Sequence, residues 1–503
     1  MSYGERTTIV MGPPGTGKTT KLLSIVDELL RSGVPPDQIC YLAFTRKAAT
    51  EAINRAMEKF QFDRDQLPWF RTIHSLAFKQ LNKNSRQMMG IGDYVRIAKE
   101  CGVYISFRTI SEDGSFAGYT KGDRMMFMEV MARNLQVPLR EYWNHEQDPE
   151  ITYQEVEHFR NVLEAHKAGF GKQDFTDLLT EFVDEGPLPP HKYLIIDEAQ
   201  DLSPLQWRVA DKLAEPSKMI YVAGDDDQAI FTWAGADVDH FIDMPGKRIV
   251  LAQSYRVPAR VARKALEVCG NIAKRVDKNW LPREAPGEVQ YIADLGEIDM
   301  SRGTWLLLAR NVYLLDSLAQ ECVREGYLFS GPGVPGVNMK NIGVVRLWEK
   351  LRAGHYITVE DARLCYDLIS KENIQHGGKA KLDVAVNRKV KMEDLKQEYG
   401  LLTDDIWHVA LDRLEPMERE YFIAALRRGE KMQREPRIKV STIHGVKGGE
   451  ADNVVIVTDM AKRTFQEFAQ DPDAEHRVWY VAVTRARERV FILQNQTTQY
   501  YPL

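Results

Sequence analysis

The chain has 503 residues, too many for one compact domain, so its length predicts roughly three or four globular units. Hydrophobic residues make up 44% and charged residues 28%, and the formal net charge of −5 excludes a generally basic nucleic-acid coat protein while leaving room for a local basic channel. Five scattered cysteines without a C-x-x-C pair argue against a disulfide framework or a zinc ribbon, and no apolar run of about 18 residues occurs. We therefore expect a soluble cytoplasmic protein that does not associate with a membrane.

The first pattern is a short β-branched strand at 7–11, a glycine-rich loop, and a helix with leucines at helical spacing that ends by Gly33. The loop GPPGTGKT at 12–19 satisfies G-x-x-x-x-G-K-[ST]. Its backbone N–H groups suit phosphate oxygens, its lysine reaches the terminal phosphates, and its last hydroxyl can ligate Mg²⁺. A chance glycine-rich turn is the alternative, which the flanking strand and helix disfavour. The expected nucleotide-binding residues are Gly12, Pro13, Pro14, Gly15, Thr16, Gly17, Lys18, Thr19 and Thr20.

Two carboxylates end the buried strand expected at 193–196, in the string HKYLIIDEAQD. Ligands bind at the carboxyl ends of parallel strands, so Asp197 and Glu198 are placed for phosphoryl chemistry. We expect Asp197, together with Thr19, to hold the metal ion and Glu198 to polarise an attacking water. A strand end with solvated acids is the alternative, and the glycine-rich loop disfavours it.

The segment GDDDQAIFTWAGA at 224–236 combines three carboxylates, an amide and two aromatic rings. Asp225, Asp226 and Asp227 lack the glycine and glutamate of an EF-hand loop, and no histidine stands at ligand spacing. We expect these acids to form a turn at the end of a strand rather than a metal site.

Further strings complete an ordered set with those above: YLAFTRKAATEAI, RTIHSLAF, DFTDLL, LAQSYRVPARVARKAL, KVSTIHGVKGGEADNVVIV and HRVWYVAVTRARERVFIL. In this order they resemble the motifs of superfamily 1 helicases of the UvrD/Rep type. The resemblance implies an α/β fold with two RecA-like P-loop motor lobes built on parallel sheets, each lobe carrying a mainly helical insertion. It places the first lobe at 1–80 and 173–245 with an insertion at 81–172, and the second lobe at 246–340 and 432–503 with an insertion at 341–431.

The resemblance also implies ATP and Mg²⁺ as cofactors and assigns roles to single residues. Gln228 would sense the γ-phosphate and the attacking water, Tyr255 would stack on the adenine, and Glu450 would contact the ribose. Arg256 and Arg485, both from the second lobe, would reach the γ-phosphate. Cations aimed at the oxygens of a transferring phosphoryl group contribute on the order of 10³–10⁵ in rate.

A nucleic-acid track is implied by the same motifs, because single-strand binding combines basic side chains with aromatic stacking platforms. The candidates are Phe44 with Arg46, Thr72 with His74, Phe231 with Trp233, and Thr442 with His444. The alternatives are ordinary ones: aromatic rings in a core and hydrogen-bonded loop histidines.

The sequence departs from the family pattern in several places. No glutamine precedes the first strand, so the family's usual contact for reading adenine is missing, and we expect Tyr255 alone to tolerate other bases. Arg46 stands in TRKAA, Gly449 in KGGE, and Ala234 replaces an expected arginine.

Two basic clusters in the second insertion are either solvated or in contact with phosphates: Lys379, Lys381, Arg388, Lys389 and Lys391, and Arg427, Arg428, Lys431, Arg434, Arg437 and Lys439.

These features predict an ATP-dependent DNA helicase that translocates 3′→5′ on single-stranded DNA and opens forked DNA by coupling ATP hydrolysis to closure of the two lobes. One alternative is a single-strand translocase that displaces proteins but unwinds poorly, which the short second insertion motivates. Another is an ATP-gated nucleic-acid-binding protein that does not hydrolyse ATP, which the filled catalytic positions disfavour.

Overall fold

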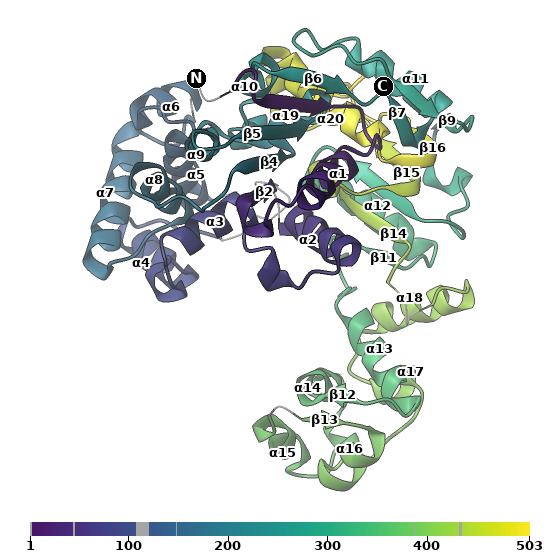
Figure 1. Cartoon of the computed structure of the whole chain (residues 1–503). Helices are drawn as coiled ribbons and strands as arrows, with labels where there is room; N and C mark the ends of the chain where they lie inside the picture. The colour runs from purple at the N-terminus through teal and green to yellow at the C-terminus, as the bar shows by residue number, and fades with distance from the viewer. Residues whose placement is uncertain (1–2, 44–45, 107–119, 147, 387, 432–434) are drawn as a thin grey trace. The chain divides into compact units, whose positions relative to one another are not determined.

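The chain forms two compact units (Figure 1). The computed structural model describes residues 3–43, 46–106, 120–146, 148–386, 388–431 and 435–503, with only the backbone at 46–49, 51 and 52. The first unit comprises Met1–Gly287, His444–Lys447 and Gln466–Thr484, and the second comprises Glu288–Ile443, Gly448–Phe465 and Arg485–Leu503.

The first unit is built on a six-stranded parallel sheet in the order β3-β2-β4-β5-β1-β6. Its strands are β1 (Thr7–Met11), β2 (Ile39–Ala43), β3 (Phe70–Thr72), β4 (Tyr193–Asp197), β5 (Met219–Gly224) and β6 (Lys247–Val250). The helices that directly follow strands β1 to β5 are α1 (Lys18–Arg31), α2 (Arg46–Phe60), α3 (Ile73–Gln80), α9 (Pro204–Ala214) and α10 (Val238–Asp243).

The short strands alternate between two buried cores, because successive side chains point to opposite faces of a sheet. Ile9, Met11 and Leu42 belong to one core, whereas Val10 and Tyr41 belong to the other. Apolar side chains covered on both faces explain why these strands are nearly continuous runs of hydrophobic residues.

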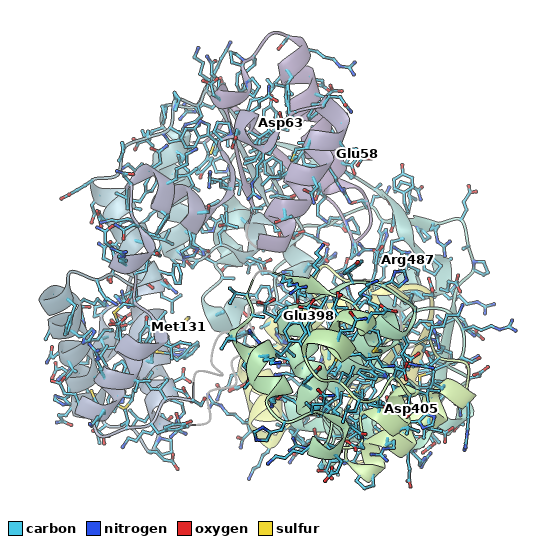
Figure 2. The ribbon with its side chains drawn as sticks, turned by 90° about the horizontal axis from the view of Figure 1, so that it is seen from below. Glu58, Asp63, Met131, Glu398, Asp405 and Arg487 are labelled. Carbon is cyan, nitrogen blue, oxygen red and sulfur yellow. The ribbon has the colours of Figure 1, made fainter. Side chains whose placement is uncertain are left out.

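A helical group lies between β3 and β4 in the chain and forms the blue part of the ribbon in Figure 1. It contains α4 (Ile91–Glu100), α5 (Lys121–Asn134), α6 (Leu139–Glu146) and α7 (Tyr153–Phe170), and α8 (Phe175–Asp184) follows it. Side chains that accept backbone N–H bonds, Thr120, Thr152 and Asp174, begin α5, α7 and α8. Met131, labelled in Figure 2, is buried in the core of this group.

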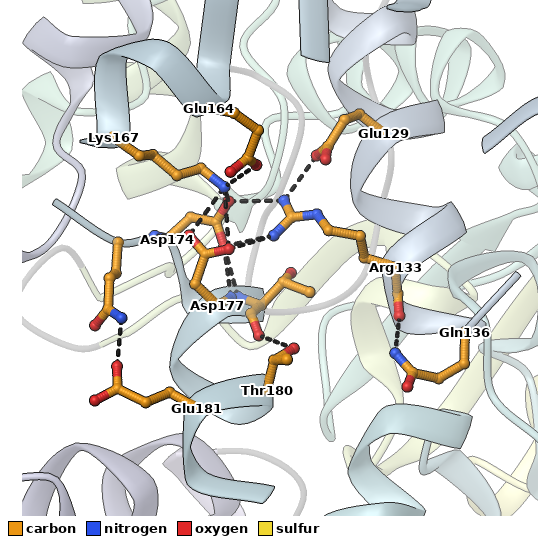
Figure 3. Close-up of polar contacts among 11 residues, drawn as sticks. Glu129, Arg133, Gln136, Glu164, Lys167, Asp174, Asp177, Thr180 and Glu181 are labelled. Atoms are coloured by element: carbon orange, nitrogen blue, oxygen red, sulfur yellow. Dashed lines mark hydrogen bonds and ion pairs between the residues drawn. The ribbon is translucent and has the colours of Figure 1, made fainter. Parts of the chain in front are cut away.

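An ionic cluster joins the helical group to α8 (Figure 3). Arg133 of α5 contacts Glu129 at 2.7 Å, Asp174 at 2.7 Å and Asp177 at 2.9 Å. Lys167 of α7 adds a second cation at 3.0 Å from Asp174. Because Glu129 and Asp174 are buried, these contacts hold α5, α7 and the start of α8 in one arrangement.

The second unit has its own six-stranded parallel sheet, in the order β11-β14-β10-β15-β16-β9. The strands are β9 (Glu288–Ile292), β10 (Trp305–Ala309), β11 (Phe329–Ser330), β14 (Ile438–Thr442), β15 (Ala451–Val457) and β16 (Ala486–Leu493). Between β11 and β14 the chain is mainly helical: α13 (Asn341–Arg352), α14 (Val359–Asp367), α15 (Gly378–Val384), α16 (Met392–Glu398), α17 (Trp407–Ala410) and α18 (Pro416–Arg427), with a two-stranded antiparallel sheet of β12 (Ile357–Thr358) and β13 (Lys389–Val390).

The predicted fold class is confirmed: two parallel α/β sheets each carry a mainly helical insertion. The compact units nevertheless divide the chain differently from the six predicted segments. Strand β6 completes the first sheet, and β7 (Gln253–Pro258), α11 (Ala259–Cys269), β8 (Leu281–Arg283) and α20 (Pro472–Val483) also belong to the first unit. α20 is grouped with the segment that follows α11 in part because the Asp473 carboxylate of α20 accepts hydrogen bonds from the backbone N–H groups of Ala273 and Lys274.

No helix among the described residues is both long enough and apolar enough to cross a membrane.

Candidate functional site

The glycine-rich loop connects β1 to the first turn of α1. Gly15 and Gly17 have φ of 74° and 81°, conformations in which a side chain is strained. The Thr16 hydroxyl donates to the Pro13 carbonyl at 2.9 Å, and the Lys18 ammonium donates to the Gly12 carbonyl at 2.8 Å. The structure therefore brings together the nine loop residues that the sequence predicted, with the N-terminus of α1 directed into the loop.

Strand β7 packs directly on this loop within the first unit. The Ser254 hydroxyl donates to the Pro14 carbonyl at 2.7 Å, and the Tyr255 N–H donates to the Gly15 carbonyl at 2.9 Å. A Cβ atom on Gly15 would overlap the Cβ of Arg256. Arg256 thus starts beside the phosphate loop and belongs to the first compact unit, because backbone contacts fix β7 to the loop.

The end of β4 places Asp197 opposite the loop. One Asp197 oxygen accepts hydrogen bonds from the Thr19 hydroxyl at 2.9 Å and from the Tyr41 hydroxyl at 2.8 Å. Burial and the neighbouring Glu198 raise the pKa of Asp197 to about 6, against the hydrogen bonds from Tyr41 and Thr19. A hydroxyl and a carboxylate oxygen side by side are ligands that Mg²⁺ prefers, so the residues present fit the expected metal ion.

Glu198 adopts a left-handed backbone conformation, with φ of 56° and ψ of 42°. Non-glycine residues seldom adopt this conformation and are found in it at functional turns. The Gln200 amide donates to the Glu198 carboxylate at 2.6 Å, and the Gln200 oxygen accepts the Asp225 N–H at 3.1 Å. The two acidic motifs are thereby joined through one glutamine side chain.

The segment 224–236 continues this network. The Gln228 amide donates to Asp225 at 2.6 Å, and the Lys447 ammonium donates to the Gln228 carbonyl at 2.6 Å. Lys447 also contacts both oxygens of Asp201, at 2.6 and 2.5 Å. Burial raises the pKa of Asp201 to about 7, and the Lys447 charge acts in the opposite direction.

The three consecutive aspartates are buried and paired with cations. Lys278 contacts Asp225 at 3.1 Å, Asp226 at 2.7 Å and Asp227 at 2.6 Å, and Arg275 binds both oxygens of Asp227. Within the described part of the chain, no group of three or more His, Cys, Asp or Glu side chains could hold a metal ion. The acids serve as internal counter-ions for a segment that lies about fifty residues further along the chain.

The aromatic residues of the same segment differ in exposure. Phe231 is buried, at 5% exposure, with the Lys447 ammonium 4.8 Å from its ring centre. Trp233 is partly exposed and stacks on Phe127 of α5, with ring centres 6.4 Å apart and planes at 21°. His444 lies edge-on to the Trp233 ring and is tilted by 48° to the Phe231 ring. Trp233 therefore fits a stacking platform better than the buried Phe231 does.

The remaining candidates for nucleic-acid contact lie in three places. Thr72 begins α3 by accepting the Ser75 N–H, and His74 packs edge-on against Phe175. Thr442 ends β14 in the second unit and is buried. Phe44 and the side chain of Arg46 lie outside the described residues.

Arg485 and Glu450 both belong to the second unit. Arg485 is buried and donates to the Gly449 carbonyl at 3.2 Å. The Glu450 carboxylate is engaged by the Arg487 guanidinium, which Figure 2 labels. Glu450 was expected to contact ribose, and such a contact would share its carboxylate with Arg487.

Many side chains of the two basic clusters are paired with acids. Lys379 pairs with Asp367 and Arg388 with Glu398. In the other cluster, Arg428 pairs with Glu325 and Arg437 with Glu430. Arg434 lies outside the described residues. These pairs support the solvated alternative more than phosphate contact.

Sequence reasoning missed two groups of residues that hold the site together: Lys278 with Arg275, and the contacts of Lys447. The string AKRVDKNW shows only a mixed-charge segment, and its acidic partners lie 48 to 53 residues earlier. No local pattern indicates such a pairing, because it depends on how α11 returns the chain to the sheet.

Comparisons with known proteins agree with the motif order. The UvrD/REP helicase N-terminal domain matches residues 1–247, and the UvrD-like helicase C-terminal domain matches residues 411–497. The chain is 26% identical over 318 residues to the ATP-dependent DNA helicase PcrA of Staphylococcus epidermidis, which covers 58% of this chain and 42% of PcrA. The PcrA proteins of Leuconostoc citreum and Staphylococcus aureus are each 25% identical, over 302 and 315 residues, which cover 56% and 58% of this chain. The chain thus aligns with less than half the length of these relatives, 40% and 42% for the last two.

Proposed function

The chain belongs to the UvrD/REP helicase family, and on this premise we propose that it hydrolyses ATP to move 3′→5′ along single-stranded DNA and to open forked duplexes. Hydrolysis would drive opening and closing of the two lobes. The substrates are single-stranded and forked DNA, and the cofactors are ATP and Mg²⁺.

One observation carries the proposal: a single short segment takes part in both halves of the machinery. The Gln228 amide donates to the Asp225 carboxylate, and the Asp225 backbone N–H is connected to Glu198 through Gln200. Five residues later the same segment presents Trp233 beside Phe127 and His444. A connection this short supports transmission between the phosphate site and a base-stacking site.

The residues of the first unit suit ATP hydrolysis. Bound Mg²⁺ would supply charge neutralisation at the phosphates, with Thr19 and Asp197 as its protein ligands. Lys18 would contact the terminal phosphates, Glu198 would accept the proton of the attacking water, and Gln228 would orient that water. We further propose that Tyr255, which is 74% exposed, stacks on the adenine.

Three further roles complete the proposal. Arg256 and Arg485 would donate to the transferring phosphoryl group, as their motifs imply. Glu450 would contact the ribose. Each of these roles can be tested by alanine substitution and measurement of kcat and KM for ATP.

The decisive experiment compares Glu198→Gln with wild type in a DNA-stimulated ATPase assay. Loss of the general base should lower kcat by about 10² or more with little change in KM. Glu215→Gln, at an exposed position after α9, is the matched control and should keep the wild-type kcat. Undiminished turnover by Glu198→Gln would remove the carboxylate from the mechanism.

Polarity and substrate are tested with 3′-tailed, 5′-tailed and RNA-tailed duplexes at several salt concentrations. We expect the 3′-tailed DNA to be unwound fastest. Faster unwinding of the 5′-tailed DNA would overturn the polarity.

A translocase that unwinds poorly is the second candidate. Neither matched family domain covers residues 248–410, which include most of the insertion between β11 and β14. DNA-stimulated ATPase with displacement of streptavidin from a biotinylated strand, but without strand separation, would favour this version.

A further inference from the structure

The loop that carries Gln228 is held by a buried lysine from another part of the first unit. Lys278 lies between α11 and β8, and its side chain is 1% exposed. Its ammonium reaches the carboxylates of Asp225, Asp226 and Asp227 at 3.1, 2.7 and 2.6 Å. One cation thus contacts all three acids of the loop.

Other groups support the same contact. Arg275 binds Asp227 at 2.8 and 2.6 Å, and the Val276 N–H donates to Asp226 at 2.7 Å. From α20, the Arg477 guanidinium donates to the Asp226 carbonyl at 3.0 Å and to the Lys274 carbonyl at 2.7 Å. Buried carboxylates are tolerated only when they are paired, and here Lys278 and Arg275 pair with the three acids while Arg477 binds the backbone beside them.

The protonation of this cluster agrees with its geometry. Burial lowers the pKa of Lys278, but the carboxylates of Asp225, Asp227 and Asp226 outweigh burial, so its pKa lies above the usual range. For Asp227, burial raises the pKa, and the contacts from Arg275 and Lys278 outweigh it and lower the pKa.

Asp225 connects this cluster to the residues proposed for catalysis. One Asp225 oxygen faces the Lys278 ammonium, and the other accepts the Gln228 amide at 2.6 Å. Because an ionised carboxylate only accepts hydrogen bonds, this contact fixes which end of the amide faces Asp225. The Asp225 N–H donates to Gln200, which in turn donates to Glu198.

We propose that Lys278 is a positioning residue for ATP hydrolysis, acting through Asp225 to hold Gln228 and Glu198 in their working orientations. The inference rests on the proposed function of those two residues. Lys278 makes no contact with Lys18 or Thr19, so it should affect the chemical step more than the binding of ATP.

The test compares Lys278→Met with Lys278→Arg and with the control Lys274→Met. Lys274 lies four residues earlier in the same segment, but its side chain is 46% exposed and pairs with the exposed Asp239 and Asp243. In DNA-stimulated ATPase assays, Lys278→Met should lower kcat by about tenfold to a hundredfold, with KM for ATP changed by no more than about twofold. Lys278→Arg should recover most of the loss, and Lys274→Met should match wild type.

Hydrogen exchange provides a readout that does not depend on activity. Peptides covering 197–201 and 225–228 should lose protection in Lys278→Met and keep it in Lys274→Met. If the wild type shows no DNA-stimulated ATPase, the proposed function fails, and exchange alone decides whether Lys278 positions the two loops.

Should Lys278→Met not fold, the double variant Lys278→Met with Asp226→Asn removes one excess buried charge. A folded double variant with low kcat and unprotected loops supports the proposal. Wild-type kcat with unchanged exchange in either variant would overturn it.

Discussion

Gly15 and Gly33 share one backbone conformation but have different surroundings. Their φ angles are 74° and 88°. A Cβ on Gly15 would overlap Arg256 and approach the Ser254 hydroxyl to 3.1 Å, whereas a Cβ on Gly33 would meet nothing within 4 Å. The pair therefore separates the cost of backbone strain from the cost of a steric clash.

We predict that Gly15→Ala lowers ATP affinity at least about tenfold, because the clash displaces the loop from β7. Gly33→Ala should cost only the strain of the left-handed conformation, about 1–2 kcal/mol of stability, and leave ATP affinity unchanged. Equilibrium binding of a fluorescent ATP analogue and melting temperatures measure the two effects. Equal ATP affinity in both variants would show that the β7 contact does not shape the loop.

Asp197 predicts how the stability of the protein depends on pH, because its pKa of about 6 in the folded state lies above the ordinary value of 3.8. An acid with a raised folded pKa stabilises the fold least once it is ionised, so wild-type stability falls as pH rises from about 4 to about 6 and is flat above. Asp197→Asn should remove this loss. Its stability relative to wild type should be greater at pH 8 than at pH 5 by on the order of 1–2 kcal/mol.

Melting temperatures at the two pH values measure this effect, and the exposed Asp37→Asn serves as control. The Asn variant also loses stability because its hydrogen bonds with Tyr41 and Thr19 are weakened, and this loss is about the same at both pH values. The same difference from wild type at pH 5 and pH 8 would contradict a raised pKa.

Among the elements, the junction of α5, α7 and α8 depends most on charge. Arg133 is the common partner of Glu129, Asp174 and Asp177, and burial raises the pKa of Glu129. We predict that Arg133→Met destabilises the first unit by about 3–5 kcal/mol, because it leaves buried carboxylates short of a partner.

Lys121→Met, on the same helix, is the matched control, since the pair of Lys121 with Glu155 is more exposed than the contacts of Arg133. It should cost less than about 1 kcal/mol. Differential scanning calorimetry and hydrogen exchange in α7 compare the variants, and a loss no greater for Arg133→Met than for Lys121→Met would contradict the prediction.

Coupling between nucleotide and nucleic acid concerns the whole molecule. We predict that Trp233→Ala weakens single-strand DNA binding and translocation more than basal ATPase activity, since a stacked base contributes about 1–3 kcal/mol. Trp233→Phe should retain part of the affinity. Fluorescence anisotropy with labelled DNA and ATPase assays without DNA measure the two effects, and an equal loss of both would count against the division within the segment.

The fold and the site were predictable from sequence to different extents. Strands β1 and β4 of the first sheet could be predicted because their hydrophobic runs are covered on both faces: Leu194 belongs to one core and Ile195 to the other. The phosphate loop could be predicted because glycines and a lysine at this spacing are typical of a site that binds nucleotide phosphates. The burial of Phe231 could not be predicted, since its contacts include Lys447, which lies 216 residues further along the chain.

The sequence by itself determined the phosphate loop and the carboxylates of β4, because each is a local pattern. It also determined the helicase family and its parallel α/β class, because several such local motifs follow one another in a fixed order. Only the tertiary structure decided that Arg256 stands beside Gly15 in the first unit, that three aspartates are paired with Lys278 and Arg275, and that Gln200 joins Glu198 to Asp225. Those contacts join segments that are distant in sequence. Charge pairing across such separations leaves no periodic or local signature, so it appears only when the chain is folded.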